Sequence, residues 1–287
     1  MKKIILSIII CITLMSIKNV SAIEKEINNY TNNNGVLISK ENYEKIKDIM
    51  TQNQIDELDE SIYSLIDQSE KIISYKDTFI ETTTFNDNMQ LSFNRELSAE
   101  EYQEISTKEL SSYVVSDNHY TTYKHISLIV RYDSGKYIFN LTNQWLLEPA
   151  TESYDVLGLR WSGSVTKNNS DAKGNQEYYN PTGTIDENIP YSYTSTNFKF
   201  FSNGLGLSQN LKDGPYKYNN SIEIYVTCTG IVNLYGTYQH AQSDVTLAQS
   251  KSYSLSSSGL GGVLYYSDSS IRNKYDNTGG LSVSFTC

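Results

Sequence analysis

Carboxylates and histidines are the residues of this chain whose positions suggest acid–base chemistry. Asp155 shares the alternation of Leu157 and Leu159, so a strand through this stretch turns its carboxylate toward the apolar face. A buried carboxylate is costly unless it is hydrogen-bonded or paired. Asp155 therefore either anchors backbone amides, which is the more common arrangement, or serves as the acid or base of a carboxylate-based hydrolase.

His240 lies four residues before Asp244 in a polar stretch. A carboxylate can orient an imidazole for general-base catalysis, but a His–Asp pair so close in sequence more often caps a turn. His125 has the parity opposite to the apolar residues of its strand, which predicts an exposed position. The sequence contains no Gly-x-Ser-x-Gly elbow. Asp155, His240 and Asp244 are thus weak catalytic candidates, and the sequence favours a protein that is not an enzyme.

Cys228 and Cys287 each end an alternating apolar segment, so both thiols point to the apolar face of their strands. This predicts a disulfide that closes a loop of about sixty residues, and the alternative is two separate buried thiols. Two cysteines alone do not form a metal site. In the stretch NSDAKGNQE, which resembles a calcium loop, Lys173 stands where an oxygen ligand belongs. We therefore expect no metal and no cofactor.

Tyrosine is unusually abundant, with 24 tyrosines against 8 phenylalanines. A tyrosine combines a rigid apolar ring with a polar tip, which suits recognition of glycans and proteins. Tyrosine is also a good strand former, so many of these residues can simply belong to sheet surfaces. Trp161, Tyr235 and Tyr238 are weak candidates for contacts with a partner.

Residues 1–22, MKKIILSIIICITLMSIKNVSA, have the three parts of a secretory signal. Lys2 and Lys3 precede an apolar run, and small residues precede a cleavage point after Ala22. The run is about twelve residues long, shorter than the roughly twenty of a membrane-spanning helix. The sequence therefore predicts a secreted, extracellular protein.

The chain is acidic, with 23 basic and 33 acidic residues and a net charge of −10. Loss of residues 1–22 removes three lysines and leaves 20 basic residues against 33, a net charge of −13. Nucleic acid is not expected as a partner, because phosphate binding needs clustered Lys and Arg. A membrane interaction is possible through a local basic patch but is not favoured.

Helical signals are concentrated in residues 23–110. Ser39 can cap a first helix, and Thr51 with Gln54 forms a capping box for a second. Ser98 with Glu101 repeats this arrangement for a shorter third helix. The second helix carries an apolar stripe made of Ile55, Leu58, Ile62 and Leu65. These residues predict a small helical N-terminal region.

Residues 111–287 alternate with period two instead. A hairpin is predicted from Tyr120 to Trp145, with its turn at Asp133-Ser134-Gly135. Further strands are expected at 154–161, 197–201, 221–234, 262–266 and 281–287, separated by Gly, Ser, Asn and Asp. Many short strands of this kind predict an antiparallel β-sandwich-like domain, giving a mainly β (α+β overall) chain.

The predicted hairpin allows a second interpretation. Each arm is about nine to thirteen residues long and has one apolar face, which is long enough to cross a bilayer as a strand. A pore-forming toxin or a bacteriocin-like protein is therefore an alternative to an ordinary hairpin of the sheet.

Several short motifs together resemble a group of uncharacterised secreted proteins of Gram-positive bacteria. The motifs are Trp145, Pro149, Ser153-Tyr154-Asp155-Val156, Gly158, Tyr238-Gln239-His240-Ala241, Gly259-Leu260-Gly261 and Lys274-Tyr275-Asp276. The resemblance implies export and a fold with a helical N-terminal part and a β-rich remainder, but no activity. In that group a basic residue often precedes Ser-Tyr-Asp, whereas Glu152 stands here, so any pairing of that basic residue with Asp155 is absent.

The leading interpretation is a secreted, non-enzymatic binding protein whose partner is an extracellular glycan or protein. The alternatives are the membrane-acting protein and the carboxylate-based hydrolase described above.

Overall fold

The computed structural model describes residues 29–85, 92–107, 119–147, 149, 151–212, 217–256, 263–276 and 278–287. The predicted signal segment with its cleavage point, and the Gly259-Leu260-Gly261 motif, lie outside these ranges. Within them, no helix is both long and apolar enough to cross a membrane.

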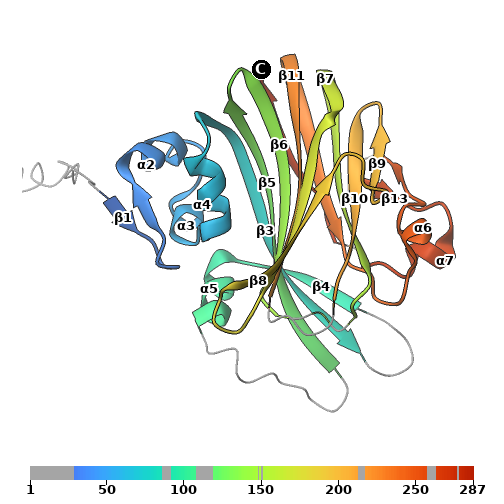
Figure 1. Cartoon of the computed structure of the whole chain (residues 1–287). Helices are drawn as coiled ribbons and strands as arrows, with labels where there is room; N and C mark the ends of the chain where they lie inside the picture. Colours follow the sequence, from blue (N-terminus) through green and yellow to red (C-terminus); the bar gives the residue numbers. More distant parts are fainter. Residues whose placement is uncertain are drawn as a thin grey trace, which may run out of the picture.

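Strands dominate the fold, as predicted for a mainly β chain (Figure 1). They are β1 (Asn29–Thr31), β2 (Leu37–Ser39), β3 (Lys71–Phe85), β4 (Ser92–Leu97), β5 (His119–Asp133), β6 (Lys136–Trp145), β7 (Tyr154–Tyr179), β8 (Ile185–Ser192), β9 (Phe198–Phe201), β10 (Gly204–Asn210), β11 (Lys217–Gln239), β12 (Ser254–Leu255), β13 (Leu264–Tyr265) and β14 (Leu281–Thr286). The helices are α2 (Lys40–Ile46), α3 (Gln52–Asp56), α4 (Glu60–Asp67), α5 (Ala99–Thr107), α6 (Leu247–Ser250) and α7 (Ser269–Arg272).

One antiparallel sheet contains ten of these strands, in the order β4-β3-β5-β6-β11-β7-β10-β9, with β8 on β7 and β14 on β11. The long strands β7 and β11 each serve two sets of neighbours. Residues 218–226 of β11 pair with β6, whereas residues 231–236 pair with β14. Residues 154–160 of β7 pair with β10, and residues 173–179 pair with β8. The sheet therefore consists of two halves that share β7 and β11.

The two halves pack face to face around the main core. Gly236 of β11 lies so close to the other half that a Cβ there would be 2.9 Å from Leu141 and 3.0 Å from Leu128. Gly174 of β7 likewise faces Leu207 of β10, which a Cβ would approach to 2.1 Å. Between the halves lie Trp145, Leu157, Leu159, Trp161, Ile222, Ile224, Leu234 and Tyr238, all buried. This is the expected sandwich-like arrangement.

The ladder between β7 and β11 is interrupted where the strands pass from one half to the other. The register shifts between Thr229 and Asn233. Gly230 on β11 and Gly163 on β7 both have positive φ, 71° and 104°, a conformation that glycine adopts at little cost. These two glycines therefore allow both long strands to change direction.

The predicted helix starts are confirmed. The side chain of Ser39 accepts a hydrogen bond from Asn42, Thr51 and Gln54 form a capping box, and Ser98 accepts from Glu101. The helix expected to run from Thr51 past Leu65 is instead two helices. Asp59 caps α4 independently, accepting from the Ile62 amide at 2.9 Å.

Helices α2, α3 and α4 cover the outer face of β3 and β5, where Ile72, Tyr75 and Ile129 join their apolar residues in a second core. The expected helical region 23–110 also contains β3 and β4, which belong to the main sheet. The main sheet therefore includes strands from both sides of the predicted boundary at residue 110. Strand β3 pairs with β4 on one side and with β5, which lies beyond that boundary, on the other.

The hairpin from β5 to β6 turns at Ser134 and Gly135 as predicted. Both arms are interior strands of the sheet, because β5 also pairs with β3 and β6 also pairs with β11. In this fold the hairpin is therefore held on both sides by neighbouring strands.

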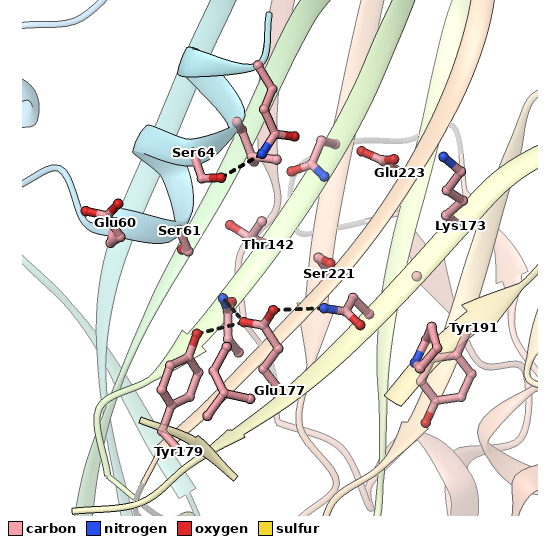
Figure 2. A pocket seen from close by; sticks show the side chains of 18 of the residues that line it. Glu60, Ser61, Ser64, Thr142, Lys173, Glu177, Tyr179, Tyr191, Ser221 and Glu223 are labelled. Atoms are coloured by element: carbon pink, nitrogen blue, oxygen red, sulfur yellow. Dashed lines mark hydrogen bonds between the residues drawn. The ribbon is translucent and has the colours of Figure 1, made fainter. Parts of the chain in front are cut away.

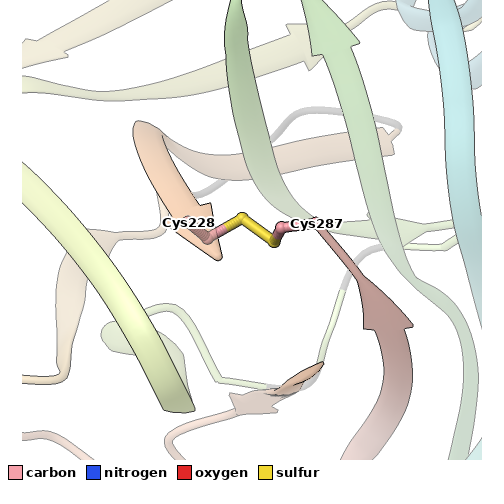
Figure 3. The surroundings of a disulfide bond; sticks show 2 residues. All are labelled: Cys228 and Cys287. Atoms are coloured by element: carbon pink, nitrogen blue, oxygen red, sulfur yellow. A yellow bond between two sulfur atoms is a disulfide. The ribbon is translucent and has the colours of Figure 1, made fainter. Parts of the chain in front are cut away.

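The predicted disulfide is present. Cys228, on β11, is bonded to Cys287, the residue after β14, with the two Cα atoms 5.7 Å apart (Figure 3). Both residues are half-buried and pack against the main core. The bond fixes the last strand to the point where β11 bends.

The expectation that His125 is exposed is wrong, because helices cover its face of the sheet. The residue is only 4% exposed and its ring stacks on Phe79 at 4.3 Å. Its Nε2 lies 3.3 Å from Asp77, and its Nδ1 lies 3.7 Å from Asp59. His125 thus links β5 to the start of α4 through Asp59 and to the neighbouring strand β3 through Asp77.

These contacts predict a pH dependence of stability. Burial lowers the pKa of His125, but hydrogen bonds and charge attraction from Asp59 and Asp77 outweigh it and raise the pKa from 6.5 to about 9. A raised folded-state pKa gives stability that is complete below pH 6.5 and is lost as the pH rises toward 9, by at most about 3 kcal/mol. Tyr75 and Tyr102, which also face this site, have raised pKa values because of burial and remain neutral in this range.

The measurement is an NMR titration of the His125 ring, combined with urea unfolding at pH 6 and pH 9. We expect the ring to titrate near pH 9 and the protein to be less stable at the higher pH. Titration near pH 6.5 would contradict the ion-paired arrangement.

Candidate functional site

A groove of about 1200 Å³ lies on the outer face of the half-sheet formed by β5, β6, β11 and β7. Helix α4 forms one wall and β8, with the turn that precedes it, forms the other. Figure 2 shows Glu60, Ser61 and Ser64 of α4 on one side, and Lys173 and Tyr191 on the other. The groove is therefore bounded by elements that are far apart in the sequence.

Simple alternation along three strands builds the floor. On β6, β11 and β7, apolar residues such as Leu141 and Ile222 point into the core, so their neighbours point outward into the groove. These outward residues are Asn140 and Thr142 on β6, Asn219, Ser221, Glu223 and Tyr225 on β11, and Lys173, Asn175, Glu177 and Tyr179 on β7. The floor is thus a surface of amides, hydroxyls, carboxylates and phenol rings.

Glu177 organises the middle of the floor. Its carboxylate accepts hydrogen bonds from Asn175 at 2.9 Å, from the Tyr179 hydroxyl at 2.7 Å and from Asn219 at 3.2 Å (Figure 2). Burial, and next the hydrogen bond to Glu177, raise the pKa of Tyr179, so its hydroxyl stays protonated and donates. The side chains around Glu177 are consequently held in place before any ligand arrives.

The charges of the groove nearly balance. Arg131 donates to Glu223 at 2.7 Å, and the Lys173 ammonium lies 5.1 Å from the centre of the Tyr225 ring. With Glu60 and Glu177, the lining carries three carboxylates and two cations. An ion of either sign therefore gains little from this groove as a whole.

Some buried polar atoms of the lining have no hydrogen-bond partner. They are the amide oxygens of Asn140 and Asn219 and the Nε of Arg131. These three side chains are 2%, 8% and 4% exposed, so each unpaired atom carries a desolvation cost. Such atoms are points where a ligand or ordered water can supply the missing partner.

Comparisons with known proteins give no family. No family model matches the chain, and no curated protein sequence matches it. Among solved structures, the collagen-binding domain of a Staphylococcus aureus adhesin shares 8% identity over 54% of this chain and 90% of its own, with a TM-score of 0.30. The keratin-10-binding region of the pneumococcal serine-rich repeat protein PsrP shares 11% over 75% and 100%, with a TM-score of 0.29. The enzymatically active domain of bacteriophage CBA120 tailspike protein 4 shares 12% over 53% and 18%, with a TM-score of 0.21.

Two of the weak catalytic candidates, Asp155 and His240, lie elsewhere, in a buried polar cluster at one end of the sandwich. Asp155 is fully buried, and its carboxylate accepts from the Ala241 amide at 2.9 Å and from the Tyr238 hydroxyl. His240 Nδ1 lies 3.0 Å from Asp155 Oδ1. Asp244 is exposed on the surface, so the partner of His240 is the carboxylate 85 residues away and not the one four residues away.

The weak binding candidates do not line the groove. Trp161 and Tyr238 are buried in the main core, and the Trp145 indole donates to the Tyr238 hydroxyl at 2.7 Å. Tyr235 is half-buried beside Arg160, whose guanidinium lies 5.8 Å from the centre of the Tyr235 ring. Part of the groove floor was not predicted because residues 162–179 and 217–220 lack a regular alternation of polar and apolar residues. The other floor residues stand on predicted strands, but the sequence does not show which strands pair.

Proposed function

We propose that this chain is an extracellular, non-enzymatic binding protein that holds a glycan in the groove between α4 and β8. The observation that carries the proposal is the floor itself, in which outward amide, hydroxyl and phenol groups are fixed on interior strands. This proposal narrows the general expectation of a glycan or protein partner to a glycan.

The position of the floor favours a glycan over an extended peptide. A peptide commonly binds by adding a strand to an exposed sheet edge, where its backbone meets unpaired backbone groups. The floor strands β6 and β11 have strand neighbours on both sides along the groove, so their backbone groups are already paired. Recognition there depends on side chains. A ligand rich in hydroxyl groups can form hydrogen bonds with the amides, hydroxyls and carboxylates of the floor.

The chemistry of the lining fits a neutral sugar chain. Amides and carboxylates can each bind two neighbouring hydroxyl groups, and the rings of Tyr179, Tyr191 and Tyr225 offer apolar faces for the C–H surface of a sugar. The near balance of charge in the lining disfavours strongly anionic chains. The prearranged hydrogen bonds around Glu177 reduce the ordering cost of binding.

The two carboxylates on the floor of the groove are occupied, which supports binding without catalysis. Glu177 accepts three side-chain hydrogen bonds and Glu223 is paired with Arg131. Asp155, the candidate for hydrolase chemistry, is fully buried outside the groove, and its oxygens are engaged by His240, Tyr238 and Ala241. A general acid or base must reach its substrate.

Export is part of this proposal. The segment at 1–22 has the pattern of a secretory signal, and a disulfide between Cys228 and Cys287 suits an oxidising compartment. An extracellular location is also what the resemblance to a group of secreted Gram-positive proteins implies.

A polysaccharide panel tests the proposal with a matched pair of variants. Tyr191 lines the groove, whereas Tyr193, two residues later and 45% exposed, does not. We expect the wild type to bind at least one neutral polysaccharide, and Tyr191→Ala to weaken that binding about tenfold, as the loss of a central aromatic contact does. Tyr193→Ala is expected to bind as the wild type does.

Thermal melting of each variant separates loss of a contact from loss of the fold. Equal weakening by both substitutions, with unchanged melting temperatures, would place the binding surface outside the groove. Binding only to proteins, with no glycan bound, would overturn the glycan assignment.

A further inference from the structure

A lysine and an aspartate are enclosed together in the buried polar cluster. Lys124 of β5 and Asp276, in the loop between α7 and β14, both have side chains with no solvent exposure. The Lys124 ammonium contacts the Oδ2 atom of Asp276. Among the described residues, Asp276 is the acceptor for this ammonium, so the nucleophile and the carboxyl group are already adjacent.

The walls around this pair are aromatic and exclude water. The Lys124 nitrogen lies 5.0 Å from the centre of the Trp145 ring and 5.6 Å from that of Tyr238. Both rings are fully buried, and the Tyr238 hydroxyl is fixed between Trp145 and Asp155. Removing water from such a site favours a condensation that releases water and slows its reversal by hydrolysis.

The second oxygen of Asp276 is held by a backbone donor. Its Oδ1 accepts from the backbone N–H of His240 at 2.8 Å. The Thr278 hydroxyl lies 3.1 Å from the same oxygen and shares its proton with a shorter bond of 2.7 Å to the Tyr238 carbonyl. Attack on the Asp276 carboxyl carbon would place negative charge on this oxygen. Fixed donors at the position where charge develops are the arrangement that stabilises a tetrahedral intermediate.

We propose that Lys124 and Asp276 form an intramolecular amide bond. One ammonium proton passes to the Asp276 carboxylate, which leaves a neutral amine and a neutral acid. The Lys124 nitrogen then attacks the carboxyl carbon, and Oδ1 takes the charge. The Cγ–Oδ2 bond breaks, and Oδ2 leaves as water with the second proton of the amine. The step consumes no other reagent and releases one water molecule.

Asp155 is a positioning residue for this reaction. It holds the Tyr238 ring through its hydroxyl and His240 through Nδ1, and His240 in turn presents its backbone N–H to Asp276. The product joins β5 to the segment before β14. With the Cys228–Cys287 disulfide, the C-terminal segment of the chain would then be fixed by two covalent links.

Mass spectrometry of the purified full chain tests the proposal. Without reduction, we expect the mass to be lower by one water molecule than that of the disulfide-bonded chain. Proteolysis should give a branched peptide that contains both Lys124 and Asp276. A mass without this loss, or a loss of water located at other residues, would overturn the proposal.

Two variants provide controls. In Asp276→Asn the same bond forms with loss of ammonia, so the expected final mass equals that of the cross-linked wild type. In Lys124→Met no bond can form, and the mass should show only the disulfide. If Asp276→Asn folds, as judged by circular dichroism, and keeps its uncondensed mass while the wild type shows no loss, the geometry does not support the reaction.

Discussion

Removal of the Cys228–Cys287 disulfide is expected to lower the free energy of unfolding by about 4 kcal/mol. The bond closes a loop with a sequence separation of 59, and a link of this length restricts the unfolded chain strongly in the chain-entropy description. The loop contains the second half of β11 and all of β14, which lie side by side. Their pairing no longer has a covalent restraint after reduction.

Urea unfolding of the oxidised protein and of the double variant Cys228→Ser/Cys287→Ser measures this effect. The single variant Cys228→Ser, which also leaves Cys287 unpaired, should lose nearly as much stability as the double variant. Equal unfolding midpoints for oxidised protein and double variant would contradict a stabilising bond. Labelling of Cys228 or Cys287 by a thiol reagent before reduction would contradict the bond itself.

The substitution Asp155→Asn is expected to lower the free energy of unfolding by about 4 kcal/mol. Asp155 is fully buried and accepts from Tyr238, His240 and the Ala241 amide. An amide at this position removes one of the two acceptor oxygens and leaves buried donors unpaired, and breaking such a buried cluster typically costs 3–5 kcal/mol.

Asp244→Asn is the matched control, because Asp244 is exposed and its carboxylate takes no part in the cluster. We expect its effect to be within about 0.5 kcal/mol. The two variants also decide between a structural and a catalytic role. Loss of a detected hydrolase activity in Asp155→Asn, with an unchanged melting temperature, would contradict the structural role assigned here.

Features with local causes could be predicted from the sequence. Ser39, Thr51 and Ser98 cap helices through residues only three positions away, and the turn at Ser134-Gly135 depends on its own backbone. The inward parity of Asp155 and of the two cysteines, toward the apolar face, follows from alternation within a single strand. Each of these predictions needed a window of a few residues.

Features that depend on distant partners were missed. Residues 162–179 are rich in Ser, Asn, Lys and Gly and have weak strand propensity, yet pairing with β11 and β8 makes them a long strand. His125 is buried because Asp59 at the start of α4 and Tyr102 of α5, both from another part of the chain, lie against it. The His240–Asp155 pair spans 85 residues, and parity alone does not bring such residues together.

The groove shows the same limit most clearly. Asn140, Asn175 and Asn219 come from three strands, and they line one groove only because β6, β11 and β7 pair side by side. Each asparagine is unremarkable in its own sequence context. The site is therefore a property of the sheet and not of any motif.

Hydrogen exchange measured by mass spectrometry, with and without the best-binding polysaccharide of the panel, tests the central claim most directly. If the groove is the binding site, the ligand will slow exchange in peptides from α4, β8 and the second half of β7. Peptides from β12 and β13, which contribute nothing to the groove, will be unchanged. Protection confined to β12 and β13, or exchange that is unaltered throughout while binding is saturated, would contradict the assignment of the groove.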